Sequence, residues 1–220
     1  VPVINSHVIK TVNGEFESPE GIKYPCFVKP NVSVEHSKSI MRKCDSEEEL
    51  QNHIFAISRR RDREMLVEDY IEIAKEYAVL GLSAGDTVIA PAAFAVEEYG
   101  RGERKGIAVS GKTVPVSRLQ PLTDKAVEFV RSLNFTGLFD VDVIEDSEGN
   151  QYFVELNLRF GASGYVFTKC GVNLPGMYAD YVLKGIRPET DCEDRITELH
   201  FANERELLEN SVTGDLGREK

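Results

Sequence analysis

The chain has 220 residues, of which 41% are hydrophobic and 29% charged, and its formal net charge is −11. This length allows one large domain or two small ones with a hydrophobic core, and the composition excludes a disordered chain. The negative charge argues against a nucleic-acid surface, although a phosphate ligand could still bind in a locally basic pocket.

The cysteines are Cys26, Cys44, Cys170 and Cys192, widely spaced and without a CxxC pair. This pattern favours reduced, buried thiols over a disulfide framework or a zinc site. No long apolar stretch or signal-like start is present, so we expect a cytoplasmic protein without membrane insertion. Because the sequence begins at Val1 without a methionine, we expect a trimmed fragment.

The first third of the chain predicts three strands and a helix. YPCFVKP (24–30) and residues 40–44 are expected to be short strands, and residues 65–70 a third. Between them, Ser46 with Glu49 predicts a capping box, and Leu50, Ile54, Phe55 and Ile57 recur at helical spacing.

The rest of the chain alternates strands and helices. We expect strands at 76–82, 87–96 and 106–116, with a charged mobile loop at 97–105. Residues 195–202 fit either a strand or a helix, and we favour a strand. Thr123 is expected to cap a helix that buries Ala126, Val127, Phe129, Val130 and Leu133, and a second helix is expected at 174–183, entered through Pro175 and ending near Gly185. The fold class is therefore α+β, with antiparallel sheets carrying helices.

Residues 139–164, FDVDVIEDSEGNQYFVELNLRFGASG, predict a β-hairpin with a turn at Glu148–Gly149. This turn would place Asp142 opposite Glu155 and Asp140 opposite Asn157. Since side chains alternate along a strand, one face would hold Asp140, Asp142, Phe153, Glu155, Asn157 and Arg159. The core face would then hold Val141, Val143, Val154, Leu156 and Leu158.

Facing carboxylates on neighbouring strands repel each other. A solvated polar surface would tolerate this repulsion at small cost. A Mg²⁺ ion bound by one or two carboxylates together with phosphate oxygens would remove it, and we favour this interpretation over a solvated face and over a Ca²⁺ site.

Three other signals are ambiguous by themselves. Lys29 ends a strand and precedes a serine-containing segment with Ser37 and Lys38; it suits a phosphate contact, but a surface lysine is the better interpretation of this signal alone because the segment lacks glycine. Glu68, Asp69 and Glu76 could line a purine and ribose pocket or form a solvated charged connection. When this signal is taken by itself, the solvated connection is the favoured interpretation. Arg159 could pair with Asp140 or bind a carboxylate or acyl-phosphate.

The order of these signals resembles the ATP-grasp superfamily of carboxylate–amine ligases. The resemblance covers nearly the whole chain, and its most specific part is DVDV followed by YFVELNLRFGASG. The Asn-x-Arg ending looks like the carbamoyl-phosphate-synthase-like branch, and ELNLRFGASGY…GVNLP is similar to D-aspartate ligases of cell-wall assembly.

The resemblance implies two α+β subdomains whose antiparallel sheets grip a nucleotide between them, at 1–70 and 71–220. It implies that Lys29, with Ser37 and Lys38, contacts the phosphates of ATP. It also implies that Glu68, Asp69 and Ile71 line the adenine pocket and that Glu76 meets the ribose. The Mg²⁺ ligands, with Mn²⁺ as an alternative ion, would be Asp142, Glu155 and Asn157, and Arg159 would be the catalytic residue that steadies the carboxylate and its phosphorylated form.

The implied function is an ATP-dependent ligase that joins a small-molecule carboxylate to an amine through an acyl-phosphate, with D-aspartate-type ligation as the narrower expectation. The alternatives are a carbamoyl-phosphate-synthase-like carboxylate kinase domain, a nucleotide-binding module that has lost catalysis, and a metal-binding module without nucleotide. Such ligases carry an amino-terminal domain before the region matched here, and we expect that domain to be missing from this chain.

Overall fold

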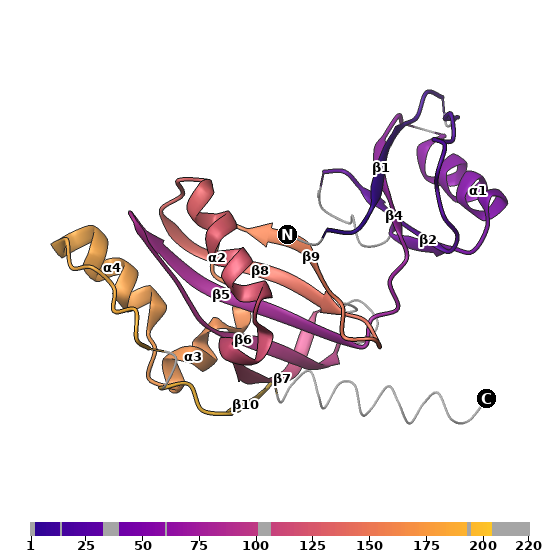
Figure 1. Cartoon of the computed structure of the whole chain (residues 1–220). Coiled ribbons are helices and arrows are strands. Elements are labelled where there is room, and N and C mark those ends of the chain that lie inside the picture. Colours follow the sequence, from indigo (N-terminus) through magenta and orange to yellow (C-terminus); the bar gives the residue numbers. More distant parts are fainter. Residues whose placement is uncertain are drawn as a thin grey trace. The chain divides into compact units, whose positions relative to one another are not determined.

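The chain divides into two compact units, Val3–Glu72 and Ile73–Lys220 (Figure 1). The computed structural model describes residues 3–13, 15–32, 40–59, 61–100, 107–192 and 195–203. The subdomain limits expected from the sequence, 1–70 and 71–220, stay a prediction.

The first unit is a four-stranded antiparallel sheet with one helix, and its strand order is β1–β4–β2–β3. Its elements are β1 (Ser6–Lys10), β2 (Cys26–Pro30), β3 (Arg42–Cys44), α1 (Glu47–Ser58) and β4 (Glu64–Asp69). The three strands and the helix predicted for this part of the chain are all present, with ends that differ by up to two residues.

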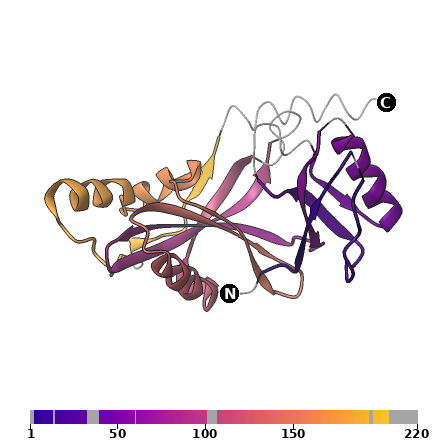
Figure 2. The same cartoon turned by 90° about the horizontal axis from the view of Figure 1, so that it is seen from above.

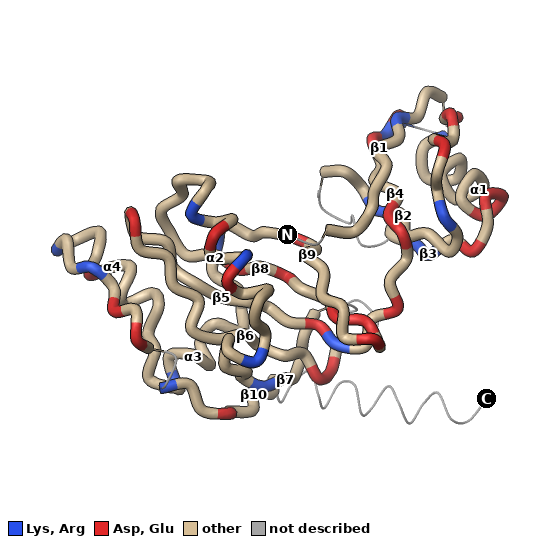
Figure 3. The backbone as a smooth tube through the Cα atoms, in the orientation of Figure 1, with Lys and Arg blue, Asp and Glu red and all other residues tan. Residues whose placement is uncertain are grey.

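Helix α1 begins as the capping-box pattern predicts. The Ser46 hydroxyl accepts from the Glu49 backbone N–H, at 3.3 Å. The Glu49 carboxylate accepts from the backbone N–H of Asp45, one residue before the position expected for a capping box. Glutamates fill the first turn, where they complement the helix dipole (Figure 3).

One face of the first sheet forms a core with α1. Leu50 and Ile54 of the helix have no exposed surface and pack with Val28 and Val67 of the sheet. Phe55, which belongs to the same run of apolar residues at helical spacing, is 53% exposed. The opposite face of the sheet is therefore the one on which charged side chains can lie.

The second unit contains a six-stranded antiparallel sheet in the order β10–β7–β6–β5–β8–β9. Its strands are β5 (Lys75–Ala84), β6 (Thr87–Tyr99), β7 (Ala108–Pro115), β8 (Gly137–Glu145), β9 (Gln151–Asn157) and β10 (His200–Ala202). Its helical elements are η3 (Val116–Leu119), α2 (Leu122–Ser132), η4 (Ala162–Gly164), α3 (Tyr165–Lys169) and α4 (Leu174–Lys184).

Helices cover both faces of this sheet (Figures 1 and 2). Helix α2 packs on one face through Leu122, Ala126 and Val130. Helices α3 and α4 pack on the other face through side chains that include Phe167 and Leu174. The two apolar clusters make a two-sided core around β5 and β6, the two central strands of the sheet.

The start of α2 differs from the prediction. Its N-cap residue is Pro121, and Thr123 lies inside the first turn with its hydroxyl 3.4 Å from the Val116 carbonyl oxygen. Two residues expected on the buried side, Phe129 and Leu133, are 41% and 44% exposed, because the buried stripe is limited to about one residue per turn.

Helix α4 follows its sequence signals closely. Asn173 caps its start by accepting from the Gly176 backbone N–H at 3.0 Å, and Pro175 lies in the first turn. Gly185 ends the helix in the left-handed conformation, with φ of 69°.

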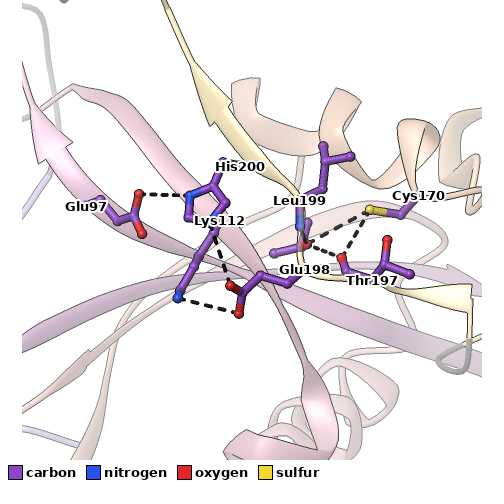
Figure 4. Close-up of polar contacts among 8 residues, drawn as sticks. Glu97, Lys112, Cys170, Thr197, Glu198, Leu199 and His200 are labelled. Atoms are coloured by element: carbon purple, nitrogen blue, oxygen red, sulfur yellow. Dashed lines mark hydrogen bonds and ion pairs between the residues drawn. The ribbon is translucent and has the colours of Figure 1, made fainter.

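The edge strand β10 is shorter than expected, because only residues 200–202 of the predicted strand 195–202 pair with β7. The preceding residues are attached to β7 mainly at Thr113. Its hydroxyl donates to the Thr197 carbonyl at 2.6 Å and accepts from the Leu199 N–H at 2.9 Å, and its backbone N–H donates to the Leu199 carbonyl at 3.1 Å. His200 lies between the carboxylates of Glu97 and Glu198 (Figure 4).

Strand β6 also corrects a prediction, because residues 97–99 of the expected loop 97–105 continue the strand. Residues 101–105 lie outside the described part of the chain. The four cysteines are free thiols, and Cys26, Cys44 and Cys192 are buried as expected, whereas Cys170 is partly exposed. In the described residues, no helix has the length and apolarity needed to cross a membrane.

Candidate functional site

The hairpin of β8 and β9 brings the expected acidic residues together. Asp142 lies directly opposite Glu155, and Asp140 lies directly opposite Asn157, which confirms the predicted register at these positions. The Asn157 side-chain amide donates to Asp142 Oδ2 at 3.3 Å. The two carboxylates and one amide expected to hold a metal ion therefore lie on one face of the hairpin.

A β-bulge corrects the prediction for the rest of the hairpin. The register shifts between Asp142 and Val143, so that Val143 pairs with Phe153 and Val154 is the extra residue. Phe153 consequently packs with the core on the opposite side and does not share the acidic face. Val154 and Leu158, expected in the core, are 37% and 52% exposed.

The acidic face continues across the sheet into β5. Ala78 pairs with Asp142 and Leu80 with Asp140, so these side chains share one face with the acids. Leu80 belongs to the core under α3 and α4, whereas Glu76, four residues earlier on the same face, is partly exposed. The face thus changes along β5 from apolar core to a carboxylate-bearing surface.

Ionisation of the Asp142 carboxyl group is unfavourable on this surface. Burial raises the pKa of its carboxyl group to about 6, and the negative charges of Glu155 and Glu76 act in the same direction. Arg159 and the hydrogen bond from Asn157 oppose the rise. An ionised Asp142 therefore lacks enough positive charge around it, and a bound cation would supply that charge.

Asp140 has a similar environment. It is 7% exposed, and burial together with the charge of Asp142 raises its pKa to about 7. Its Oδ1 atom is buried without a hydrogen-bond partner among the described residues. Its Oδ2 atom lies so close to Gly161 that a methyl group there would overlap it, which explains why the bend after β9 carries a glycine.

Arg159 follows β9 and is exposed. Its positive charge acts on both Asp140 and Asp142, since it lowers the pKa of each carboxyl group against the larger effects of burial and of neighbouring carboxylates. Within the part of the chain that the structure describes, no ion pair joins Arg159 to Asp140, so the simple salt bridge considered for this arginine is not formed.

These residues fit a magnesium ion in their chemistry. Carboxylate and amide oxygens are ligands that Mg²⁺ accepts, and it completes its shell with water and phosphate oxygens. The described residues contain no group of three or more His, Cys, Asp or Glu side chains placed to hold a metal by themselves. A site of two carboxylates and one amide therefore needs oxygens from a ligand.

The first unit carries a separate charged pair. Lys29 Nζ lies 2.8 Å from Glu68 Oε2, and the two side chains are only 19% and 12% exposed. The strand register places the side chains of Lys29 and Glu68 on the same face of the sheet, because Phe27 pairs with Glu68 and Lys29 pairs with Leu66. Helix α1 does not cover this face. The Glu68 carboxylate thus binds Lys29 in this structure, and its expected contact with adenine stays a prediction.

The remaining predicted residues are less informative. Asp69, at the end of β4, contacts Lys23 at 3.6 Å and Asn5 at 3.4 Å. Ile71 is partly buried in the connection that follows. Ser37 and Lys38, expected at the phosphates, lie outside the described residues.

Tyr99 is a residue of this surface that the sequence did not single out. It is the last residue of β6, and its hydroxyl is buried beside Glu76. Its position in EEYGRGERK resembles a charged loop, and the apolar run at 88–96 that precedes it does not indicate that the strand continues to Tyr99.

The sheet arrangement, together with opposed acids on a hairpin, defines the chain as an ATP-grasp protein of the α+β class. Residues 6–170 match the family described as D-ala D-ala ligase C-terminus, and the chain belongs to that family.

Three similar proteins illustrate the relationship. The chain is 26% identical over 165 residues to the formate-dependent phosphoribosylglycinamide formyltransferase of Bacteroides thetaiotaomicron, covering 74% of this chain and 42% of that protein. The L-amino acid ligase of Bacillus licheniformis superposes with a TM-score of 0.61 and 18% identity, covering 88% of this chain and 45% of the ligase. The N5-carboxyaminoimidazole synthase of Aspergillus clavatus, solved in complex with ADP, superposes with a TM-score of 0.62 and 15% identity, covering 86% and 48%.

The chain spans less than half of the length of each of these three proteins. The structural likenesses, at such low identity, show the fold.

Proposed function

We propose that this chain is the nucleotide-binding part of an ATP-dependent ligase that joins a carboxylate to an amine through an acyl-phosphate. The observation that carries the proposal is the face on which Asp142 opposes Glu155 and receives the Asn157 amide. Family membership supports ATP as the nucleotide, and relatives named for formate and for amino acids support a small carboxylate as substrate.

Each proposed contact uses chemistry that the residues already have. Asp142, Glu155 and Asn157 would hold Mg²⁺, with Mn²⁺ as an alternative, and the ion would neutralise negative charge on the phosphates during transfer. Glu76 would accept from ribose hydroxyls, and Lys29, with Ser37 and Lys38, would bind phosphate oxygens. Glu68, Asp69 and Ile71 would line the adenine pocket.

Arg159 would act on the reacting carboxylate. A guanidinium presents a rigid fork of donors that matches a carboxylate or a phosphate, and it keeps its charge at any physiological pH. Because Arg159 is exposed and makes no ion pair with the buried Asp140, its guanidinium is available to a substrate. It would orient the carboxylate for attack on the γ-phosphorus and stabilise the oxyanion when the amine attacks the acyl-phosphate.

Substrate identity is a finer proposal. The run ELNLRFGASGY favours amino-acid ligation of the D-aspartate type, and the Asn-x-Arg ending is compatible with a carbamoyl-phosphate-synthase-like carboxylate kinase. The amine and carboxylate would both be small molecules.

Calorimetric titration of this chain with Mg·ATP tests the proposal. We expect Asp142→Asn and Glu155→Gln each to weaken binding roughly tenfold or more, because each removes a charged metal ligand. Asp146→Asn is the matched control, since Asp146 lies in the turn of the same hairpin and bonds to Asn150, away from the acidic face.

Equal affinity in all four proteins would remove the metal assignment. Binding of ATP without release of ADP and phosphate, when the whole protein is supplied with carboxylates and amines, would favour a nucleotide-binding module that has lost catalysis.

A further inference from the structure

Tyr99 and Glu76 come together although they lie on different strands. The last paired residues at this end of β5 and β6 are Tyr77 and Ala95, so Glu76 and the final residues of β6 extend to the same end of the sheet. Two irregularities in the pairing of β6 with β7, at Val96–Glu98 and Glu98–Tyr99, change the direction of the last side chains. Tyr99 thereby reaches the acidic face.

The Tyr99 hydroxyl is buried, and the Glu76 carboxylate lies close enough to act on it as a hydrogen-bond acceptor. Burial raises the pKa of Tyr99, and the bond to Glu76 and the charges of Glu76 and Asp142 raise it further, so the phenol keeps its proton and remains a donor.

Glu76 needs such a partner to stay in place. Its negative charge acts on Asp142, which Glu155 also repels, and a flexible glutamate can lower this repulsion by turning its carboxylate toward water. A phenol with few rotatable bonds that donates to the carboxylate opposes this movement. Since a carboxylate has lone pairs for several donors, Glu76 can accept from Tyr99 and from a ligand hydroxyl at the same time.

We propose that Tyr99 is a positioning residue that fixes the Glu76 carboxylate for recognition of the ribose hydroxyls of the nucleotide. This inference rests on the proposed function, in which Glu76 meets the ribose. Tyr99 would thus contribute, through Glu76, to the selection of ribonucleotides over deoxynucleotides. It would also link the residue that contacts the ribose to the face that binds the metal ion.

The test is calorimetric titration of the chain with Mg²⁺ complexes of ATP, 2′-deoxy-ATP and 3′-deoxy-ATP. We expect the original protein to prefer ATP over at least one deoxy nucleotide by roughly tenfold, the usual effect of a hydrogen bond to a charged group. Tyr99→Phe removes only the hydroxyl. It should lower affinity for ATP while leaving affinity for that deoxy nucleotide nearly unchanged, so that the preference falls to about twofold or less.

Two further variants make the result specific. Tyr152→Phe is the matched control, because the Tyr152 hydroxyl donates to Asp146 at 3.3 Å in the hairpin turn; it should keep the original preference. Glu76→Gln keeps the Tyr99 ring and should also lose the preference, and the double variant should lose no more than either single one. If Tyr99→Phe does not fold, Glu76→Gln still tests the ribose contact on which the role of Tyr99 depends, and a full preference for ATP in Glu76→Gln overturns both.

The outcomes separate the two proposals. A full preference for ATP in Tyr99→Phe overturns the role of Tyr99 and leaves the nucleotide-binding function intact. Mg·ATP binding with no preference in the original protein overturns both the ribose contact of Glu76 and the role of Tyr99. No binding of any of the three nucleotides overturns the proposed function itself.

Discussion

Asp142 on β8 faces Glu155 on β9 in direct cross-strand register, and burial raises the pKa of Asp142 to about 6. Asp140 on the same strand has a pKa raised by burial to about 7. In the unfolded chain both groups have a pKa of about 3.9. The folded chain therefore favours their protonated forms, and their ionisation opposes folding.

The first prediction concerns stability and pH. Because both folded pKa values are raised, these two groups should make the free energy of unfolding fall as the pH rises from about 4 to about 7, with little change above. Asp142→Asn should raise the free energy of unfolding at about pH 8 by roughly 1–3 kcal/mol and have a smaller effect near pH 4. Urea unfolding at the two pH values measures this.

Asp146→Asn should not stabilise the chain, since hydrogen bonds, first of all from the Asn150 side chain, lower the pKa of Asp146. If Asp142→Asn is no more stable than the original protein at either pH, the carboxylates are not the destabilising groups described above.

The second prediction concerns metal. Magnesium ions require ionised ligands, so in the presence of ATP the increase in Tm that Mg²⁺ produces should be larger at about pH 8 than at about pH 5. EDTA should reverse the increase, and Asp142→Asn should lose most of it. Differential scanning calorimetry in matched buffers gives the comparison. An increase of the same size in Asp142→Asn would show that the ion binds elsewhere.

The third prediction separates stability from binding at Lys29. Lys29→Ala leaves the Glu68 carboxylate buried without its partner and should destabilise the chain by about 1–3 kcal/mol. Adding Glu68→Gln should restore much of this stability, because a neutral amide is less costly to bury. Mg·ATP affinity should remain low in both variants, because the lysine itself is needed for the phosphates.

The pair of Lys10 and Glu64 offers the control, since Lys10 is 76% exposed and lies 3.1 Å from Glu64 on the same sheet. Lys10→Ala should change the free energy of unfolding by less than about 0.5 kcal/mol. Recovery of full nucleotide affinity in the double variant at Lys29 and Glu68 would exclude a phosphate contact for Lys29.

The fourth prediction concerns acid stability at the start of β5. Burial acts to raise the pKa of Glu145, but hydrogen bonds from Lys75 and Gln151 outweigh it and the pKa is lowered. The stabilisation is therefore complete above the unfolded pKa, about 4.3, and is lost as the pH falls through the folded value. Glu145→Gln should cost about 1 kcal/mol at pH 7 and little at pH 3. Equal losses at both pH values would show that packing, not charge, is the cause.

Much of the local structure could be predicted because its signals are short in range. Ser46 and Glu49 mark the start of α1, and Pro175 and Gly185 mark the two ends of α4. The prediction that Asp142 opposes Glu155 is confirmed, although the pairing nearer the turn is shifted by one residue and the bulge at Val154 compensates for that shift.

The bulge at Val154 was not predicted, because the apolar run Tyr152-Phe153-Val154 interrupts the alternation without showing which of its residues is the extra one. Phe153 was assigned to the acidic face for that reason, and the structure places it in the core. Thr123 was preferred as a cap because of its hydroxyl, but the chain enters α2 from η3, which fixes the start of the helix at Pro121.

The candidate site shows the same limit. Asp142, Glu155 and Asn157 are close in sequence, so their association could be inferred from one hairpin. The burial of the Asp140 oxygen and the approach of Tyr99 to Glu76 depend on how β5, β6 and β8 pair within the sheet. No local sequence pattern encodes this pairing.

The extra residue in β9 also affects how this chain should be aligned with its relatives. Some relatives could have a regular ladder in this hairpin, without the extra residue. If Glu155 and Asn157 are matched to such a relative without a gap, the residues of β9 before Val154 are matched to residues whose side chains lie on the opposite face of the sheet. Placing a one-residue gap opposite Val154 keeps Glu155 and Asn157 in step with Asp142 and Asp140 while keeping Phe153 in step with Val143.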